Sequence, residues 1–186
     1  MSESASENAL SPSPGSVNVI VACDENRAIG RGGKLPWRIR EDWRWFLERT
    51  SGGACVIGRL SYEAMLKGGN VNDKRRFFVV SRDRSLAGAF TQVFSDSIHA
   101  LEAAKASGLP VWICGGPRIY EETMFNADQL FLTRIHARIE GCDAWMPDWN
   151  GVFSSKPVYV REGNDEVFRY TFMVFRRNDV RSSPDS

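Results

Sequence analysis

With 186 residues, of which 42% are hydrophobic and 25% charged, the chain can form one globular domain with a substantial core. A net charge near +1 gives no reason to expect nucleic acid or an anionic membrane as the main partner. No apolar run approaches the roughly 20 residues that span a bilayer, and no secretory signal is recognisable, so we expect a cytoplasmic protein.

The cysteines and histidines favour a metal-free protein with reduced thiols. The cysteines are Cys23, Cys55, Cys114 and Cys142. They are far apart in the sequence and form no C-x-x-C pair, as expected for free thiols in the cytosol. His99 and His136 are too isolated to indicate a zinc site, so we expect no metal.

Both ends of the chain differ in composition from its centre. Residues 1–16 are rich in Ser, Pro and Glu with almost nothing to bury, and residues 179–186 are similar. We expect disordered tails there and one folded domain over residues 17–178. Short apolar runs then predict the first strands of the domain, at residues 17–22, 54–58, 76–81 and 111–116.

Helical patterns separate and follow these strands, at residues 40–50, about 61–66, 97–106 and 117–124. Such alternation is typical of an α/β fold with a largely parallel sheet and right-handed crossovers. After Gln129 the helical patterns stop, and residues 129–139, 157–162 and 168–177 are strand-like. The alternation in the last segment favours an antiparallel C-terminal hairpin.

One acid of the first helix lies where an acid is costly. In IREDWRWF, a helical repeat of roughly 100° per residue puts Ile39, Trp43 and Phe46 on one face. Glu41 falls opposite, where water can solvate it, and we expect no role for it. Asp42 lies only about 60° from the centre of the apolar stripe, where a carboxylate is costly unless it is paired or functional.

Three glycines in four positions follow the first strand, in NRAIGRGGKLPW. They are Gly30, Gly32 and Gly33. One interpretation is an ordinary flexible connection, since the segment is not the G-x-G-x-x-G fingerprint. The other is a mobile loop whose backbone amides approach a ligand closely.

The segment CGGPRIY (114–120) ends an apolar strand and begins a helix. Its glycines permit unusual backbone geometry, and Pro117 suits the first turn of a helix, whose free amides attract a diphosphate. A tight strand-to-helix turn is the simpler interpretation, but ligands bind at the carboxyl ends of strands in α/β sheets. Arg59 and Arg82 also follow strand ends, where a guanidinium can bind a phosphate.

Motifs of several other chemistries do not occur. The sequence has no G-x-S-x-G, no P-loop G-x-x-x-x-G-K-[ST] and no H-E-x-x-H. Acyl transfer, P-loop phosphoryl transfer and zinc hydrolysis are therefore not indicated. One carboxylate in an apolar pocket beside a dinucleotide-sized site indicates proton donation coupled to hydride transfer.

The order of the motifs resembles the dihydrofolate reductase family. AIGRGGKLPW precedes Asp42, which lies five residues after Trp37, and is followed by VIGR-x-S-Y-E, ICGGPRIYEE and LTRI. The resemblance extends from about Val17 to Arg177, and the combination of motifs is highly specific. It implies a single-domain α/β fold with a mostly parallel eight-stranded sheet, an antiparallel C-terminal hairpin and about four flanking helices.

The activity that the resemblance implies is NADPH-dependent reduction of 7,8-dihydrofolate to 5,6,7,8-tetrahydrofolate. The protein would be a monomer that binds antifolates such as methotrexate. Asp42 would bind the pterin 2-amino group and N3 and, with water, support protonation at N5. Thr133 would hydrogen-bond Asp42, and Trp37 would hold the water, so these three residues are the expected catalytic set.

The resemblance also implies a substrate site. Arg75 would pair with the α-carboxylate of the glutamate tail, with Arg76 as a competitor for that role. The residues lining the pterin and nicotinamide site would be Ile20, Ala22, Leu35, Phe46 and Cys114. Desolvation by Trp37, Trp43 and Phe46 should raise the pKa of Asp42, while a hydrogen bond to Thr133 restrains the shift.

For NADPH, the resemblance implies a mobile loop, two strand ends near the adenosine side and a diphosphate cradle with a cis peptide between Gly115 and Gly116. The residues would be Ala22, Ala28, Ile29, Gly30, Arg31, Gly32, Gly33, Lys34, Arg59, Leu60, Ser61, Ser81, Arg82, Gly115, Gly116, Pro117, Arg118, Ile119, Tyr120, Glu121 and Glu122. Pro117, Cys114 and Trp43 depart from the residues usual in the family.

Two rival functions use the same features. A pyrimidine reductase of riboflavin synthesis would also use NADPH, but it does not need a carboxylate that binds a pterin. A non-catalytic nucleotide-binding module would retain the glycine loops and lose the acid. The presence of Asp42 with Trp37 and Thr133 favours the dihydrofolate reductase over both.

Overall fold

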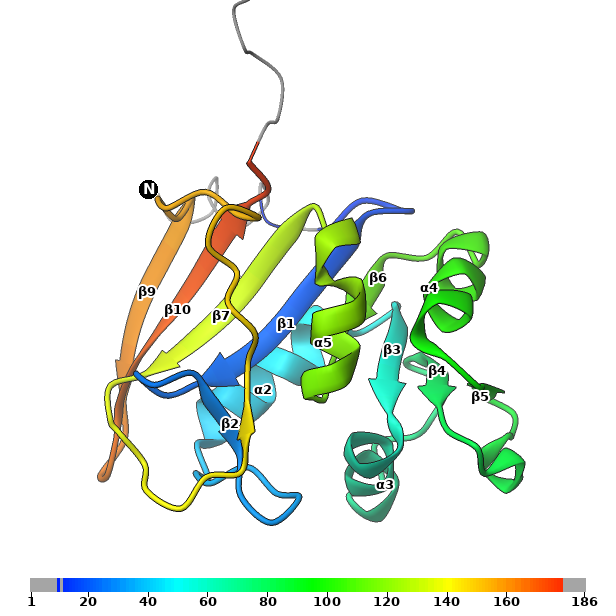
Figure 1. Cartoon of the computed structure of the whole chain (residues 1–186), viewed down its shortest axis with the longest axis horizontal. Coiled ribbons are helices and arrows are strands. Elements are labelled where there is room, and N and C mark those ends of the chain that lie inside the picture. Colours follow the sequence, from blue (N-terminus) through cyan, green and yellow to red (C-terminus); the bar gives the residue numbers. More distant parts are fainter. Residues whose placement is uncertain (1–9, 11, 179–186) are drawn as a thin grey trace, which may run out of the picture.

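The short apolar segments of the sequence form one central sheet (Figure 1). The structure is a computed structural model that describes Leu10 and residues 12–178. Eight strands pair in the order β5-β4-β3-β6-β1-β7-β10-β9. They are β1 (Val17–Cys23), β3 (Ala54–Gly58), β4 (Arg76–Val80), β5 (Thr91–Phe94), β6 (Val111–Ile113), β7 (Gln129–Ile135), β9 (Tyr159–Asn164) and β10 (Arg169–Arg176).

The sheet is parallel except at β10, which runs antiparallel to both of its neighbours, β7 and β9. The predicted eight-stranded, mostly parallel sheet with an antiparallel C-terminal hairpin is therefore confirmed. A separate two-stranded sheet joins β2 (Ala28–Gly30) to β8 (Ala144–Trp145). Strand β5 was not predicted, because its four residues, TQVF, are too few to show a period.

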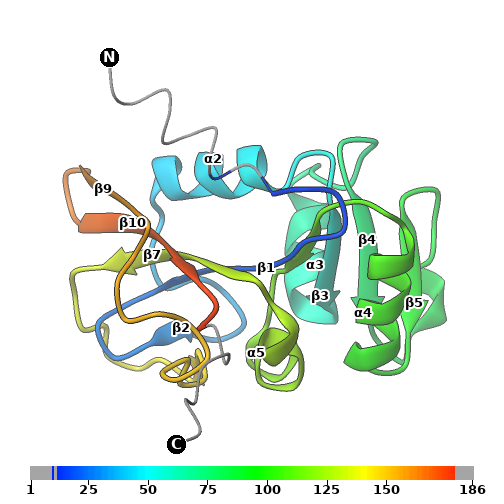
Figure 2. The ribbon, with the colours of Figure 1, turned by 90° about the horizontal axis from the view of Figure 1, so that it is seen from above.

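Four α-helices of the described part cover the two faces of the sheet (Figure 2). They are α2 (Arg40–Arg49), α3 (Arg59–Lys67), α4 (Ser97–Ala106) and α5 (Pro117–Thr123), with short 3₁₀ turns η1 (Arg84–Leu86) and η2 (Met124–Asn126). Val19 and Val21 of β1 pack with α4 and α5, whereas Ile20 packs with α2 and α3. This alternation gives each face of the sheet its own apolar cluster.

Helix α2 buries a different tryptophan from the one predicted. Its buried residues are Asp42 and Trp45, and the ring of Trp45 lies 5.0 Å from that of Phe172 on β10. Trp43 is 40% exposed and stacks on Phe46 at 5.5 Å. Trp43 and Phe46 therefore share one side of the helix as predicted, but this side borders a cavity, and α2 touches the sheet with its Trp45 side.

The expectation that Glu41 is simply solvated is also wrong. Its carboxylate accepts a hydrogen bond of 2.6 Å from the hydroxyl of Tyr170 and forms an ion pair with Arg161. Both partners come from the C-terminal hairpin, which lies beside the first turn of α2. The helical wheel could not reveal them, because they are more than a hundred residues away in the sequence.

The expected disordered tails fall mostly outside the described residues, at 1–9, 11 and 179–186. Leu10, however, is only 3% exposed and belongs to the apolar cluster beneath α2. The amide of Gly15 donates to the carbonyl of Leu109 at 3.4 Å. Packed structure therefore begins earlier than Val17. Within the described ranges, no helix has the length and apolar character that a membrane crossing requires.

Candidate active site

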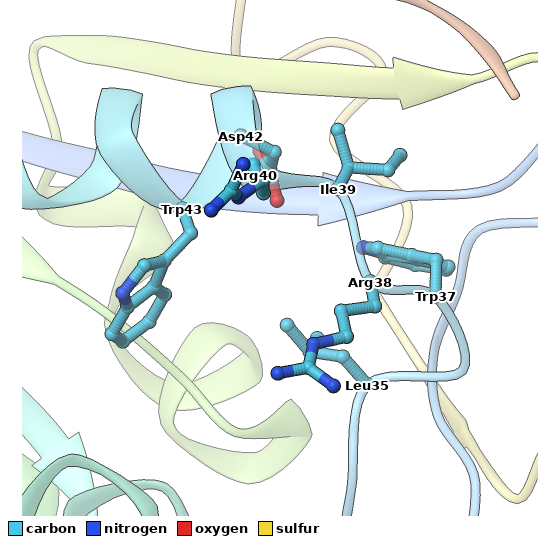
Figure 3. Close-up of a pocket in the computed structure, with 7 residues that line it drawn as sticks. All are labelled: Leu35, Trp37, Arg38, Ile39, Arg40, Asp42 and Trp43. Carbon is cyan, nitrogen blue, oxygen red and sulfur yellow. The ribbon is translucent and has the colours of Figure 1, made fainter. Parts of the chain in front are cut away.

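A buried carboxylate faces a cavity between α2 and the loop that precedes it. Asp42 is the third residue of α2 and is 9% exposed. The cavity has a volume of about 420 Å³, within the range of small-molecule sites (Figure 3). Its lining residues are Leu35, Trp37, Arg38, Ile39, Arg40, Asp42 and Trp43.

Burial raises the pKa of Asp42 to about 6, whereas hydrogen bonding to Thr133 and Trp37 lowers it. Thr133 reaches the acid from β7 and is 2% exposed. The indole N–H of Trp37 is directed toward the side of the cavity where Asp42 lies, as Figure 3 shows, and it favours the charged carboxylate, but it forms no well-aligned hydrogen bond with a described residue. An N–H buried without an acceptor is available to a water molecule or a ligand.

The expected apolar wall lies on the same face of the sheet as the acid. Ile20 belongs to the apolar cluster that contains Trp37, and Ala22, Phe46 and Cys114 pack against that cluster. Leu35, which is 51% exposed, lines the cavity from the preceding loop. The structure therefore brings the predicted pterin-site residues onto one face, although they come from four separate segments.

Two arginines of the cavity were missed by the sequence reasoning. Arg38 and Arg40 line it, and neither forms an ion pair with a described residue. Figure 3 shows Arg38 and Trp43 on opposite sides of the cavity. Arg38 directly follows Trp37, and Arg40 lies two residues before Asp42. These positions in the sequence could have indicated that both arginines lie at the site.

Arg75 and Arg76 have opposite environments. Arg75 is 4% exposed; its Nε donates to Thr50 Oγ1 at 2.7 Å, and its Nη2 donates to the carbonyl of Leu47. No described carboxylate lies within ion-pair distance of it. Arg76 is exposed and lies over the ring of Phe90 at 5.3 Å. Arg75 is therefore a buried guanidinium that lacks an anion, next to the C-terminal turn of α2.

The glycine-rich loop is tied to the segment around β8. Gly32 N–H donates to Asp143 Oδ2 at 2.9 Å, and Asp143 N–H donates to the carbonyl of Gly30 at 3.0 Å. Gly32 and Gly33 have φ angles of 57° and 75°, which glycine adopts without strain. Arg31 and Lys34 exchange backbone hydrogen bonds across the turn. The loop is thus attached to a distant segment by the side chain of Asp143 as well as by backbone pairing between β2 and β8.

Glycines line the edge where β3 and β6 end side by side. Gly58 N–H donates to the carbonyl of Gly115 at 2.7 Å, and a Cβ at Gly58 would lie 3.4 Å from the nitrogen of Gly116. The peptide between Gly115 and Gly116 is cis, as the resemblance implied. No Cβ covers the backbone at this edge, so an anionic ligand can approach the amides closely, and the residues fit a dinucleotide diphosphate.

The other predicted cofactor residues are divided. Arg59, Leu60 and Arg82 are exposed near this edge, although Arg59 pairs with Glu63 at 2.7 Å; Ser81 is 8% exposed. In α5, by contrast, Ile119 and Tyr120 are each 4% exposed and belong to the core. Their side chains are therefore structural, and the N–H of Tyr120 donates to the carbonyl of Gly116 at 3.1 Å.

Comparisons with known proteins agree with this geometry. The family model described as "Dihydrofolate reductase" matches residues 16–177. Dihydrofolate reductase HdrB of Haloferax volcanii is 31% identical over 165 residues, 86% of this chain and 82% of that protein. A dihydrofolate reductase of Staphylococcus haemolyticus is 28% identical, with 87% of this chain and 95% of that protein covered.

Among solved structures, dihydrofolate reductase from Enterococcus faecalis complexed with NADP(H) and RAB-propyl has a TM-score of 0.78 and 29% identity; the match covers 90% of this chain and 99% of that one. An open α/β sheet with a buried acid that faces a cavity and a glycine-lined strand edge is the arrangement of a nucleotide-dependent oxidoreductase. More specifically, the chain belongs to the dihydrofolate reductase family, so the predicted family is confirmed.

Proposed function

We propose that this protein reduces 7,8-dihydrofolate to 5,6,7,8-tetrahydrofolate with NADPH. One observation carries the proposal: Asp42 is buried, has no ion pair with a described residue, and faces a cavity. A buried carboxylate is costly until a ligand brings N–H donors to it. The 2-amino group and N3 of a pterin are two such donors on one edge of a flat ring.

Asp42 would also support the proton transfer. With its pKa raised to about 6, an appreciable fraction of the carboxyl is protonated near neutral pH. The unpaired indole N–H of Trp37 would hold a water molecule between the acid and pterin N5. Thr133, through its hydrogen bond, would keep the carboxyl in one orientation.

Arg75, rather than Arg76, would bind the α-carboxylate of the glutamate tail. Arg75 is buried on the α2 side and lacks an anionic partner among the described residues, so a substrate carboxylate would stabilise it. Arg76 instead lies over Phe90. The observed contacts of Arg75 with Thr50 and Leu47 fix the guanidinium near the end of the helix that carries Asp42.

NADPH, when bound, supplies the hydride. The backbone at Gly58, Gly115 and Gly116 would accommodate its diphosphate, and Ser81 and Arg82 would lie near the adenosine 2′-phosphate. The loop from Ala28 to Lys34 would cover the nicotinamide side and exclude water. All of these residues come from one chain, which supports a monomer as the working unit.

The test is oxidation of NADPH, followed by absorbance, with dihydrofolate and with or without stoichiometric methotrexate. Dihydrofolate-dependent oxidation that methotrexate abolishes is the expected result. The matched control is a pyrimidine substrate of riboflavin synthesis, which should give no oxidation. NADPH binding without oxidation by either substrate would contradict the proposal and favour a nucleotide-binding module.

A further inference from the structure

We propose that Glu41, Arg161 and Tyr170, here named the Glu41 network, position Asp42 for the substrate. The network touches neither cavity nor cofactor edge, so its members are positioning residues. The inference rests on the proposed function only for the identity of the ligand that Asp42 receives. Its structural basis is how the first turn of α2 is attached to the sheet.

The first turn of α2 has no cap of its own. Ile39 occupies the N-cap position and makes no side-chain hydrogen bond to the helix. Ser, Thr, Asp and Asn are the residues preferred at this position, because their side chains accept a hydrogen bond from the first turn. Because Asp42 lies in this same turn, whatever fixes the turn also fixes the carboxylate that faces the cavity.

Glu41 provides the missing attachment through both of its carboxylate oxygens. Oε2 accepts a hydrogen bond of 2.6 Å from the hydroxyl of Tyr170, and Oε1 forms an ion pair with Arg161. The guanidinium of Arg161 in turn lies over the ring of Phe172 at 4.3 Å. The pKa of Glu41 is lowered by its hydrogen bonds with Arg161 and Tyr170, so the acid is held in its charged form.

These partners lie in register with the residue that holds Asp42. Across the sheet, Arg161 on β9 is paired with Phe172 on β10, Phe172 with Thr133 on β7, and Thr133 with Ala22 on β1. Directly paired residues project to the same face. Figure 2 shows α2 lying over that face.

The adjacent acids of α2 therefore attach to consecutive strands. Asp42 is linked to Thr133 on β7, and Glu41 to Tyr170 on β10 and Arg161 on β9. Two attachments on neighbouring strands fix both the position of the helical turn and its rotation about the helix axis. Trp45, whose ring lies 5.0 Å from that of Phe172, packs the next turn of the helix on the same face.

Gly163 makes room for this arrangement. It is paired with Tyr170 across the hairpin, and a Cβ at position 163 would lie 2.4 Å from Cε2 of Tyr170 and 3.0 Å from Oε2 of Glu41. Because Gly163 has no side chain, the ring of Tyr170 has the space to lie toward Glu41. A substitution at Gly163 therefore disturbs the network without touching any of its members.

The alternative is an ordinary surface ion pair, since the side chains of Glu41 and Arg161 are 35% and 39% exposed. Such pairs contribute little and their loss leaves a site unchanged. The two possibilities differ in what they predict for ligands. A positioning network affects only ligands that Asp42 binds, whereas NADPH, which would bind at other segments, is unaffected.

The experiment compares Glu41→Gln, Tyr170→Phe and Gly163→Ala with the wild-type enzyme. We expect each variant to raise the KM for dihydrofolate and the Kd of methotrexate about tenfold, because misplaced groups bind poorly, with an unchanged Kd for NADPH. The matched control is Glu102→Gln, which removes the acid of an exposed pair with Lys105 on α4. That variant should match wild type in all three constants.

A double substitution and a substrate-free signal complete the test. The double variant Glu41→Gln with Tyr170→Phe should lose no more affinity for dihydrofolate and methotrexate than the worse single variant, because both substitutions break the same network. The ¹³C chemical shift of the Asp42 carboxyl should differ from the wild-type value in Glu41→Gln and equal it in Glu102→Gln. This signal does not depend on turnover of dihydrofolate. Unchanged KM, Kd and resonance in folded Glu41→Gln would overturn the inference, as would an equal loss of NADPH affinity. Absence of turnover in the wild type would instead remove the proposed function.

Discussion

Asp42 combines a poor environment for a charge with a good one for a ligand. Its pKa is raised by burial, and only two hydrogen-bond donors, from Thr133 and Trp37, offset the effect. Ligands that bring amidine-like N–H donors remove the penalty when they bind. The same carboxyl that costs stability in the free enzyme would thus account for affinity in the complex.

Replacing Asp42 with Asn should separate chemistry from cofactor binding. We expect Asp42→Asn to lose about a hundredfold or more of turnover at neutral pH, because the amide supplies no proton, while the Kd for NADPH is unchanged. Steady-state rates and a fluorescence titration with NADPH measure the two quantities. Wild-type turnover with Asn at this position would sink the proposed role.

The two neighbouring arginines should differ sharply. Arg75→Ala removes a buried guanidinium and should raise the KM for dihydrofolate roughly ten- to hundredfold, the usual value of a charge-assisted hydrogen bond. Arg76→Ala removes an exposed guanidinium, and its KM for dihydrofolate should stay within about twofold of the wild-type value. Thermal melting of both variants controls for folding. Equal losses in KM would contradict the assignment of Arg75.

Among the elements, the glycine-rich loop is attached at its tip by one acidic side chain, that of Asp143. Asp143→Ala removes the acceptor of the Gly32 amide, and we expect faster hydrogen exchange at Gly32 and about fivefold weaker NADPH binding. Asp73→Ala, at an exposed acid of another loop, is the control. If Asp143→Ala left both the exchange rate and the NADPH affinity as they are, the loop would owe its order to something else.

The elements themselves could be predicted wherever the signal was local. Four helices and most strands could be predicted from the repeat of apolar residues and from the glycine, proline and polar residues that bound each segment. Strand β5 is too short to show such a repeat. The strand expected at 111–116 ends at Ile113, and that at 129–139 ends at Ile135, because backbone pairing ends before the apolar pattern does. Local pattern gives the type of an element better than its limits.

Contacts between distant segments could not be predicted from pattern. Trp43 and Trp45 are the same residue type, so the pattern cannot distinguish them. Trp45 is the buried one because it packs against Phe172 of β10. Glu41 was expected to be solvated because its partners are 120 and 129 residues away. Ile119, part of a motif carried over as cofactor-binding, proved to belong to the core.

For the whole molecule, the raised pKa of Asp42 makes stability depend on pH. The folded state binds this proton more tightly than the unfolded chain, whose value is 3.8. The stability contributed by the protonated acid is fully present below pH 3.8 and is lost as pH rises through about 6. The loss amounts to about 3 kcal/mol in the free energy of unfolding.

Asp42→Asn should therefore be more stable than wild type at neutral pH, by up to about 3 kcal/mol, in the absence of ligand. The advantage should shrink as the pH is lowered from about 6 and disappear near 3.8. Urea denaturation of both proteins across this range measures it. A stability difference that does not vary with pH would mean that the pKa of Asp42 is not raised in the folded state.

The order of the last strands also bears on synthesis. β9 precedes β10 in the chain, but among the described strands its one neighbour in the sheet is β10, which lies between β9 and β7. A nascent polypeptide that has emerged only through β9 has nowhere to place that strand. Arg161 and Tyr170 can reach Glu41 only once β10 has been inserted. On the ribosome, a helix translated early would wait for the end of the domain before its acid is fixed in place.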